Sequence, residues 1–234
     1  GGETADVGDV VRTIAVNGTM TARWPKKKLI TNDKIDIGNV IVGFASSGQA
    51  TYETEYNSGL GSNGLTSARH DVLSKYYAEK YRETFEATLP DEVVYIGKNK
   101  MQDIFTNKIN NKEITVGKLL LSPTRTYAPL MKVLLENNFD DIYGAIHCSG
   151  GGQTKCMKYL PKPMKIVKDN LFDVPPIFTL IQENSRADFK EMYQVFNMGH
   201  RLEIFTNSLA AKEMITVAKE FNIEAKIVGR VEAS

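Results

Sequence analysis

The chain has 234 residues, of which 42% are hydrophobic and 24% charged, and its net charge at pH 7 is +1. This composition is that of a globular protein with one large or two small domains, and the balanced charge argues against a nucleic-acid surface. No apolar run reaches the ~18 residues that span a bilayer, and no signal-peptide pattern opens the chain. The two cysteines, Cys148 and Cys156, fit no zinc spacing and predict a reduced, intracellular chain.

The first half of the chain reads as strands separated by polar segments. Alternating Val, Ile and Thr indicate a strand, short apolar runs bounded by Gly or Ser indicate a buried strand, and a long polar stretch rich in glycine indicates a loop of the kind that often carries function. The predicted elements are a strand over 12–22, a polar linker over 26–36, a buried strand over 40–45, a loop over 46–64, a helix that starts near Leu65 and runs through Tyr76, and a strand over 93–96.

The second half shows clearer alternation of helices and strands. Apolar residues spaced three and four apart predict helices, and prolines mark the start of one of them. The predicted elements are a helix around 130–134, a strand over 143–146, a helical segment over 153–160, a helix from Pro175, an apolar helical stripe made by Phe189, Met192, Tyr193 and Phe196, a strand around 202–204, a helix over 214–221 capped by Ser208, and a strand over 226–231. We therefore predict an α/β chain of the α+β type, a mixed sheet with flanking helices.

The most informative local feature is the point where the strand over 143–146 meets three glycines, Gly150, Gly151 and Gly152. Glycines between a strand and a helix let backbone N–H groups approach a ligand closely, and a helix N-terminus favours an anion. This predicts a bound phosphate. The spacing is not that of a lysine-bearing P-loop, so a tight turn without a ligand is an equal alternative at this point.

Four further polar clusters interrupt the apolar framework. Glu3 follows paired glycines and could reach a metal or a metal-bound phosphate, or be a solvated turn residue. Ser62 and Asn63 precede a helix and could cap it. Arg125 follows a proline and suits phosphate or carboxylate, or is a surface arginine. Asn197 lies between a helix and a strand, where a turn and a ligand contact are equally plausible.

Taken together, the clusters point to a known family. Seven segments occur in one order along the chain: GGETAD, SNGLTSAR, LLLSPTRTY, HCSGGG, PPIFTLIQE, MYQVFNMG and IVGRVEA. They resemble the aminoimidazole ribonucleotide synthetase family, also called phosphoribosylformylglycinamidine cyclo-ligases, of purine biosynthesis. The resemblance runs from Gly1 to Ala233 and so covers essentially the whole chain.

The resemblance implies a fold, a reaction and cofactors. Residues 1–37 would be the last strand and linker of an N-terminal ATP-binding domain, and residues 38–234 a C-terminal substrate- and phosphate-binding domain, so the chain would be truncated at its N-terminus. The enzymes of this family use ATP and Mg²⁺ to activate the formamide oxygen of formylglycinamidine ribonucleotide, after which an internal nitrogen closes the imidazole ring. A cytoplasmic homodimer is implied, with neither nucleic acid nor a membrane as partner; the isolated fragment is expected to be inactive.

The resemblance also assigns roles to individual residues. Glu3 would belong to the metal–ATP site, and His147 and Asn197 to the catalytic centre, with His147 the best-placed candidate for a general base at the end of its strand. The substrate and its phosphate would be held by Ser62, Asn63, Arg125, Gly150, Gly151 and Gly152.

The chain departs from the family pattern at several points. A loop is inserted over 49–61, Gly61 stands where the family has a histidine, and His200 and Arg201 replace small or apolar residues. The usual Met-Pro-Gly after GGETAD is also missing. Two alternatives stay open: another ATP-dependent member of the superfamily, of the formylglycinamidine synthetase, selenophosphate synthetase or thiamine phosphate kinase type, and a non-catalytic binding or dimerisation module.

Overall fold

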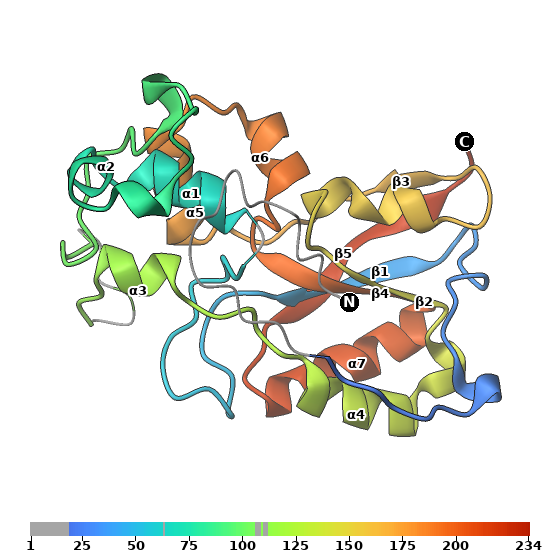
Figure 1. Ribbon diagram of the computed structural model, residues 1–234. Helices are drawn as coiled ribbons and strands as arrows, with labels where there is room; N and C mark the ends of the chain where they lie inside the picture. Colours follow the sequence, from blue (N-terminus) through green and yellow to red (C-terminus); the bar gives the residue numbers. More distant parts are fainter. Residues whose placement is uncertain (1–18, 63, 106–108, 110–111) are drawn as a thin grey trace.

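A five-stranded sheet forms the centre of the computed structural model, which describes residues 19–62, 64–105, 109 and 112–234 (Figure 1). The strand order is β2–β4–β1–β5–β3, and all four pairings are antiparallel. The strands are β1 (Val40–Ala45), β2 (Gly144–His147), β3 (Lys165–Val167), β4 (His200–Thr206) and β5 (Ala225–Glu232). The predicted fold class, a sheet with flanking helices, is confirmed, with antiparallel pairing throughout the described sheet.

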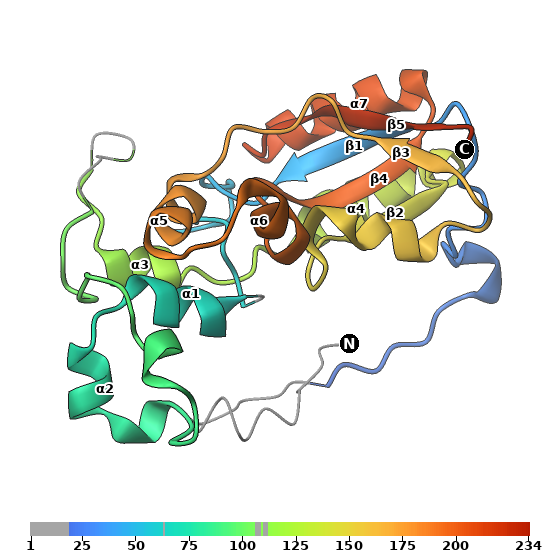
Figure 2. The ribbon, with the colours of Figure 1, turned by 90° about the horizontal axis from the view of Figure 1, so that it is seen from above.

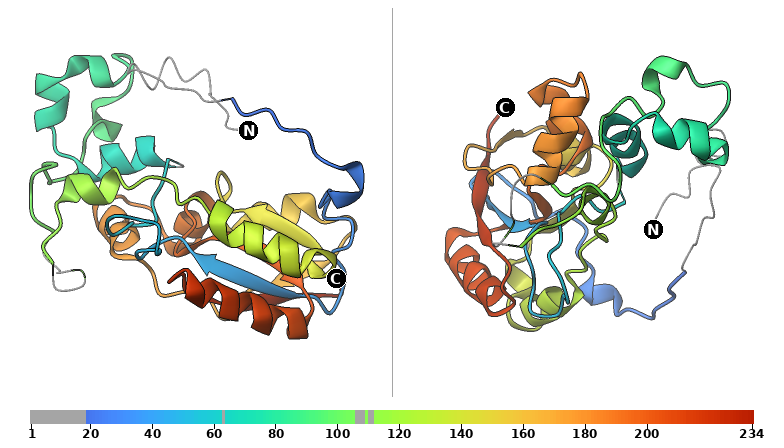
Figure 3. Two further views of the ribbon diagram at one scale, coloured as in Figure 1. Left: turned by 90° about the horizontal axis from the view of Figure 1, so that it is seen from below. Right: turned by 90° about the vertical axis from the view of Figure 1, so that its left-hand side faces the viewer.

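The helices fall into two groups. The helices α4 (Ala128–Asn137) and α7 (Ser208–Glu220) lie side by side on one face of the sheet (Figures 1 and 3). The others gather beyond one end of the sheet (Figure 2): α1 (Leu65–Val72), α2 (Tyr76–Lys80), α3 (Val116–Leu120), α5 (Pro176–Asn184) and α6 (Phe189–Val195). Short 3-10 turns span Lys26–Lys28, Arg82–Thr84, Asp91–Val93 and Phe139–Asp141, and a longer 3-10 helix, η5, spans Gly152–Tyr159.

Apolar side chains fill both faces of the sheet and the helical end. Val42 and Ile204 pack against Met214 of α7 on one face, and Phe205 belongs to a second cluster. A third cluster lies among the helices, around Phe178. Each such side chain stabilises the fold by roughly 1.5–3 kcal/mol when fully buried. Because the sheet is covered on both faces, all seven residues of β4 are buried, which differs from the alternation of exposed and buried residues expected for that strand.

The register places the ends of three strands together. Ala45, the last residue of β1, lies opposite His200, the first of β4, and His147, the last of β2, lies opposite Leu202. The loops that follow β1 and β2 therefore leave the sheet at the same end, the one that faces the helical group (Figure 1).

Most predicted elements of the second half are confirmed, with corrections at their ends. The strand over 144–147 and the helices α4, α5 and α7 lie where the periodicity indicates. The segment after the three glycines is a 3-10 helix, and the N-cap of α7 is Asn207, which accepts hydrogen bonds from two backbone N–H groups, and not Ser208. In the apolar stripe of α6, Met192 is buried, whereas Phe189 is 62% exposed.

Two predictions in the first half are wrong. The helix that starts at Leu65 ends at Val72, where Leu73 turns to an extended conformation, and α2 follows as a separate helix. The predicted strand over 93–96 is not a strand: Tyr95 has a φ of 47° and its backbone N–H donates to Nδ1 of His70 at 3.2 Å. A turn pinned by a buried histidine takes precedence there over β propensity.

The N-terminal predictions fall mostly outside the described residues. Of the strand expected over 12–22, positions 12–18 lie outside them, and 19–22 are exposed and irregular. The linker packs against the sheet at its end, where Ile35 is buried and Oδ1 of Asn32 accepts from the N–H of Ala145 at 3.0 Å. Across the described ranges, no helix is both long and apolar enough to cross a membrane.

Candidate functional site

A β-bulge at the shared end of the sheet re-aims one arginine. Phe44 of β1 lies opposite Leu202, but the next residue, Ala45, lies opposite His200, so Arg201 is the extra residue between two pairs. A bulge turns the side chain of its extra residue away from regular alternation, and bulges are common beside active sites. Arg201 is thereby placed under the loop that follows β1, and not in the regular array of the sheet.

The guanidinium of Arg201 is enclosed but incompletely bonded. The residue is 2% exposed, and its Nη2 donates to the carbonyls of Gly59, at 3.1 Å, and of Leu60. A Cβ added at Gly61 would lie 2.6 Å from this Nη2 and 2.7 Å from Oγ1 of Thr124. Gly61 is therefore needed where the two groups converge, because any side chain there would collide with them.

His147 stands at the exposed end of β2, next to this arginine. The backbone N–H of the following residue, Cys148, donates to the carbonyl of Arg201 at 2.5 Å. Partial burial, together with the positive charges of Arg201 and Lys155, lowers the pKa of His147 to about 4. The ring is thus neutral at pH 7 and can accept a proton or a hydrogen bond, as the prediction of a base requires; nothing in the described site shows which proton it would take.

The three glycines, Gly150, Gly151 and Gly152, form the glycine loop, which follows soon after His147 in the sequence. Gly151 has a φ of 93°, and a Cβ there would make an ordinary van der Waals contact with Cβ of Lys155 at 3.5 Å, whereas a Cβ on Gly152 would lie 2.5 Å from the carbonyl oxygens of Tyr193 and Phe196. Gly152 is therefore required by the packing of η5 against α6. Gly151 is favoured by its backbone conformation, since its φ lies in the left-handed region. Gly150 follows Ser149 in the same turn.

The side chain of Lys155, in η5, is hydrogen-bonded to the residue that precedes the three glycines. Nζ of Lys155 donates to Oγ of Ser149 at 2.6 Å. The loop, the N-terminus of η5 and this ammonium group together give a site of positive potential beside His147.

The two loops beside Gly61 contribute hydroxyl groups. The backbone N–H of Ser62 donates to Oγ1 of Thr124 at 3.1 Å, and the two side-chain oxygens are 3.3 Å apart. Both residues are exposed. Of the other predicted site residues, Asn63 and Glu3 lie outside the described residues.

Arg125 lies in a different environment from the one predicted. Its Nε and Nη2 form a bidentate pair with the carboxylate of Glu53, at 2.9 and 2.7 Å, and its Nη1 donates to the carbonyls of Ala45 and Ser47, both at 2.9 Å. Burial raises the pKa of the Glu53 carboxyl, but the hydrogen bonds from Arg125 and from the backbone of Ala50 outweigh it, so the pKa lies below its ordinary value. With four of its five N–H groups bonded, Arg125 fastens the inserted loop to the sheet.

Asn197 is also a buried tie between segments. Its Oδ1 accepts from Oγ of Ser46 at 2.6 Å and from the N–H of Gly199 at 3.2 Å, and its Nδ2 donates to the carbonyl of Gly59 at 2.8 Å. The residue is 3% exposed. Asn197 thus joins the turn before β4 to the loop after β1, and its expected catalytic role stays a prediction.

A buried polar cluster lies behind the glycine loop that the sequence analysis did not assign. Oε1 of Glu203 accepts from Nε2 of His200 at 2.8 Å and pairs with Nζ of Lys168 at 2.5 Å, and Lys168 also donates to the backbone and side chain of Gln153 in η5. Burial raises the pKa of Glu203, but its bonds to His200 and Lys168 outweigh this and lower it. The polar residues after FNMG were the one signal of this cluster in the sequence.

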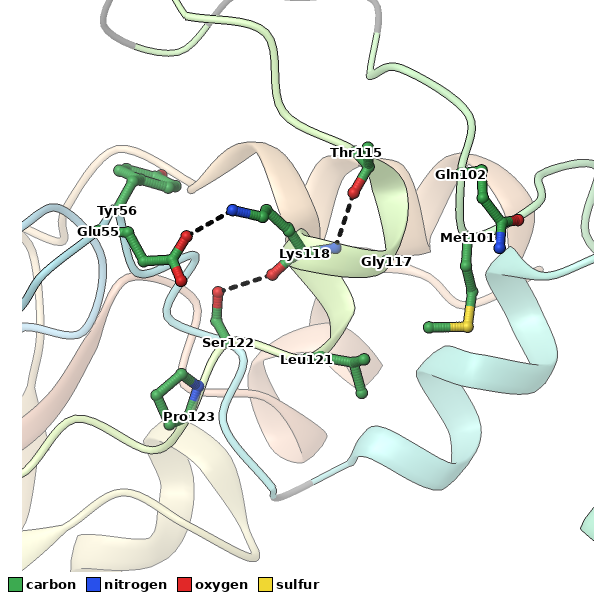
Figure 4. Close-up of a pocket in the computed structure, with 10 residues that line it drawn as sticks. All are labelled: Glu55, Tyr56, Met101, Gln102, Thr115, Gly117, Lys118, Leu121, Ser122 and Pro123. Carbon is green, nitrogen blue, oxygen red and sulfur yellow. Dashed lines mark hydrogen bonds and ion pairs between the residues drawn. The ribbon is translucent and has the colours of Figure 1, made fainter.

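Three hollows of the described surface have no residue of the glycine loop in their lining. One, of about 390 Å³, is shown in Figure 4 and lies between the inserted loop and α3. Nζ of Lys118 and the carboxylate of Glu55 form an ion pair of 2.7 Å across its rim, and Ser122 donates to the carbonyl of Lys118 at 3.0 Å (Figure 4). Its charged groups are paired with one another, so it offers a ligand little beyond apolar contact.

The described residues contain no group of three or more His, Cys, Asp or Glu side chains that could hold a metal ion. The donor set that Mg²⁺ prefers, several oxygen ligands around one point, is therefore not met in this part of the chain. The cluster around Arg201 has the opposite character, since cations and neutral donors predominate.

In the comparison with known proteins, the matching family model and the curated relatives agree. The family model described as "AIR synthase related protein, C-terminal domain" matches residues 36–234. Phosphoribosylformylglycinamidine cyclo-ligases of Methanocaldococcus jannaschii and Bacillus thuringiensis are 30% and 28% identical over 99% and 98% of this chain. The chain spans 55% and 57% of those two relatives' length. A solved structure titled "T. maritima PurL complexed with FGAR" aligns with a TM-score of 0.43 at 14% identity, covering 89% of this chain and 26% of that chain.

Proposed function

The chain belongs to the family of AIR synthase related proteins through its C-terminal domain, and from this premise we propose that it forms the substrate-binding part of a phosphoribosylformylglycinamidine cyclo-ligase. The observation that carries the proposal is that His147, the glycine loop and the loop that bears Ser62 all leave the sheet at the same end. Cyclo-ligase relatives match the chain over nearly its whole length, which favours this reaction over the other members of the superfamily.

The role proposed for these residues is binding and orientation. The glycine loop, with the N-terminus of η5 and Lys155, holds a phosphate group of formylglycinamidine ribonucleotide. The neutral ring of His147 lies beside that position, within reach of a proton-bearing group of the bound substrate. Ring closure depends on holding the attacking nitrogen against its carbon, and such positioning supplies much of the rate in intramolecular reactions.

ATP, Mg²⁺, a homodimer and a cytoplasmic location remain parts of the proposal that come from the family resemblance. The described residues offer no metal-binding cluster, and Glu3, the predicted ATP–metal residue, lies outside them. We therefore assign no step that involves ATP or magnesium to this part of the chain.

The first test is ring closure by the gene product that carries this chain. Incubation with formylglycinamidine ribonucleotide, ATP and Mg²⁺ should release aminoimidazole ribonucleotide, measured by mass spectrometry. The 234-residue chain assayed alone is expected to bind substrate without turnover. If the gene product binds substrate and never closes the ring, the chain acts as a binding module and the proposal fails.

The second test concerns the glycine loop. Gly151→Val should weaken substrate binding by about tenfold or more, because a branched side chain at a φ of 93° strains the loop and crowds Lys155. Gly38→Val is the matched control: Gly38 also has a positive φ, of 88°, with nothing within 4 Å of its missing Cβ, and it precedes β1 at the other end of the sheet. Equal affinity in both variants, by calorimetry, would reduce the three glycines to a turn.

A further inference from the structure

Arg201 has hydrogen-bonding capacity that the fold does not use. Nη2 makes both of its hydrogen bonds, and neither Nε nor Nη1 has an acceptor among the described residues. Three of the five N–H groups of this guanidinium are therefore free. Nε and Nη1 are not among the fully enclosed polar atoms that lack a partner, so both keep contact with solvent although the residue is 2% exposed.

An arginine in this condition is unusual because burying an unpaired charge is costly. Arg125, at the same end of the sheet, shows how the chain satisfies a buried guanidinium when its role is structural: a carboxylate and two carbonyls accept from it. Arg201 donates to two carbonyls, and among the described residues no carboxylate pairs with it. An anion from outside the chain would supply the missing counter-charge.

The surroundings of Arg201 select the kind of anion. His147 lies next to it on the neighbouring strand, the hydroxyls of Ser62 and Thr124 lie beside Gly61, and Lys155 is close enough to His147 for its charge to act on that ring. These groups come from four segments of the chain: β2, η5 and the two loops that carry Ser62 and Thr124. A tetrahedral phosphate group with several acceptor oxygens suits them better than a planar carboxylate.

We propose that Arg201 is a phosphate-binding residue, which the bulge in β4 aims at the space between His147 and the Ser62–Thr124 pair. The inference deepens the proposed function, because it names the cation that neutralises a phosphate of the substrate at this site. The sequence had marked Arg201 as a departure from the family and given it no role.

The test begins with the unmodified 234-residue chain and inorganic phosphate as the probe. The Nε–H of Arg201 is followed by ¹H–¹⁵N NMR and assigned by its absence in Arg201→Lys. Saturable movement of this signal with phosphate, at constant ionic strength set with chloride, is the expected result. A signal that does not move when phosphate shifts the backbone amides of the glycine loop would show that phosphate binds there without Arg201, and would overturn the inference.

The second arm compares affinities. Arg201→Gln should bind phosphate at least tenfold more weakly than the unmodified chain. Arg230→Gln should bind within twofold: it removes the same charge from an exposed arginine, paired with Asp169 and Glu232, near the other end of β5. If Arg201→Gln fails to fold, the Nε–H titration of the unmodified chain decides alone.

These outcomes separate the inference from the proposed function. If the gene product closes the ring but the Nε–H signal of Arg201 does not move with phosphate, the cyclo-ligase proposal holds and the role of Arg201 is wrong. If phosphate binds through Arg201 but the gene product never closes the ring, the role of Arg201 holds and the cyclo-ligase proposal is wrong.

Discussion

Arg125 and Arg201 are buried arginines that reach the same end of the sheet from different segments, and they are used in opposite ways. Four of the five N–H groups of Arg125 are bonded, two of them to a carboxylate with 15% of its side chain exposed. Arg201 bonds two carbonyls, and its Nε and Nη1 have no acceptor in the part of the chain that the structure describes. The two residues share their type and their burial, so what distinguishes them is the set of groups that they bond. The region around Arg125 is closed, because its donors are bonded within the chain, and the region around Arg201 is open, because it has donors left for an anion.

The largest effect should come from opening the closed region. Arg125→Met removes the counter-charge of Glu53 and the donor to the carbonyls of Ala45 and Ser47. Breaking a buried ion pair by removing one partner costs about 3–5 kcal/mol of the free energy of unfolding, measured by urea denaturation. Arg201→Met should cost less, about 1–3 kcal/mol, because it removes hydrogen bonds to two carbonyls and no ion pair. If Arg201→Met loses more unfolding free energy than Arg125→Met, then Arg201 is the structural arginine of the two and this comparison fails.

The next largest effect tests Asn197, whose hydrogen bonds join the turn before β4 to the loop after β1. Asn197→Ala leaves Oγ of Ser46, the N–H of Gly199 and the carbonyl of Gly59 without their partner, and should cost about 2–3 kcal/mol of unfolding free energy. Asn197→Asp keeps the acceptor oxygen and serves as the milder control. An Asn197→Ala variant of the gene product with normal stability and no turnover would restore the predicted catalytic role of Asn197 in place of the structural one.

A smaller effect separates two neighbouring glycines. Gly152→Ala places a Cβ 2.5 Å from the carbonyl oxygens of Tyr193 and Phe196, and such overpacking costs about 1–3 kcal/mol. Gly151→Ala makes only an ordinary contact with Lys155, at 3.5 Å, and should cost about 1 kcal/mol for its positive φ. Thermal unfolding of the two variants gives the order directly. Equal losses would mean that the loop relaxes away from α6, and that the closed packing behind it is weaker than the distances indicate.

The sequence predicted those parts of the fold that depend on local pattern. Apolar spacing located α4, α5 and α7, and the run 40–45 located β1, because each buries one continuous set of side chains. The end of α1 and the turn at Tyr95 escaped prediction, since both depend on His70, whose contacts with 95 and 96 are made only after folding.

The site was predicted less well, for a comparable reason. Arg125 has the residue type and the loop position of a phosphate ligand, but its partner Glu53 lies 72 residues away in sequence, and no local pattern announces that pairing. Arg201 was visible as an unusual residue. Its direction depends on a one-residue shift between β1 and β4, which periodicity cannot reveal. His147 and the glycine loop could be predicted to lie together because the strand and the turn are contiguous in sequence; their role in binding stays a prediction.

The smallest effect is a change in the titration of His147, and it tests the open region without disturbing its packing. Partial burial comes first among the causes that hold the pKa of His147 at about 4, followed by the charges of Arg201 and Lys155. Since the unfolded pKa is near 6.5, the contribution of this residue to stability is complete above pH 6.5 and is lost as the pH falls from 6.5 toward 4. Arg201→Gln should raise the pKa of His147 and narrow that window, whereas Arg230→Gln should not, as followed by the ring ¹³C–¹H signals. Phosphate bound between the two residues should also raise it, because the anion favours the protonated ring. If phosphate raises the pKa equally in Arg201→Gln, the anion reaches His147 through the glycine loop alone, and the open region needs only one of its two cations.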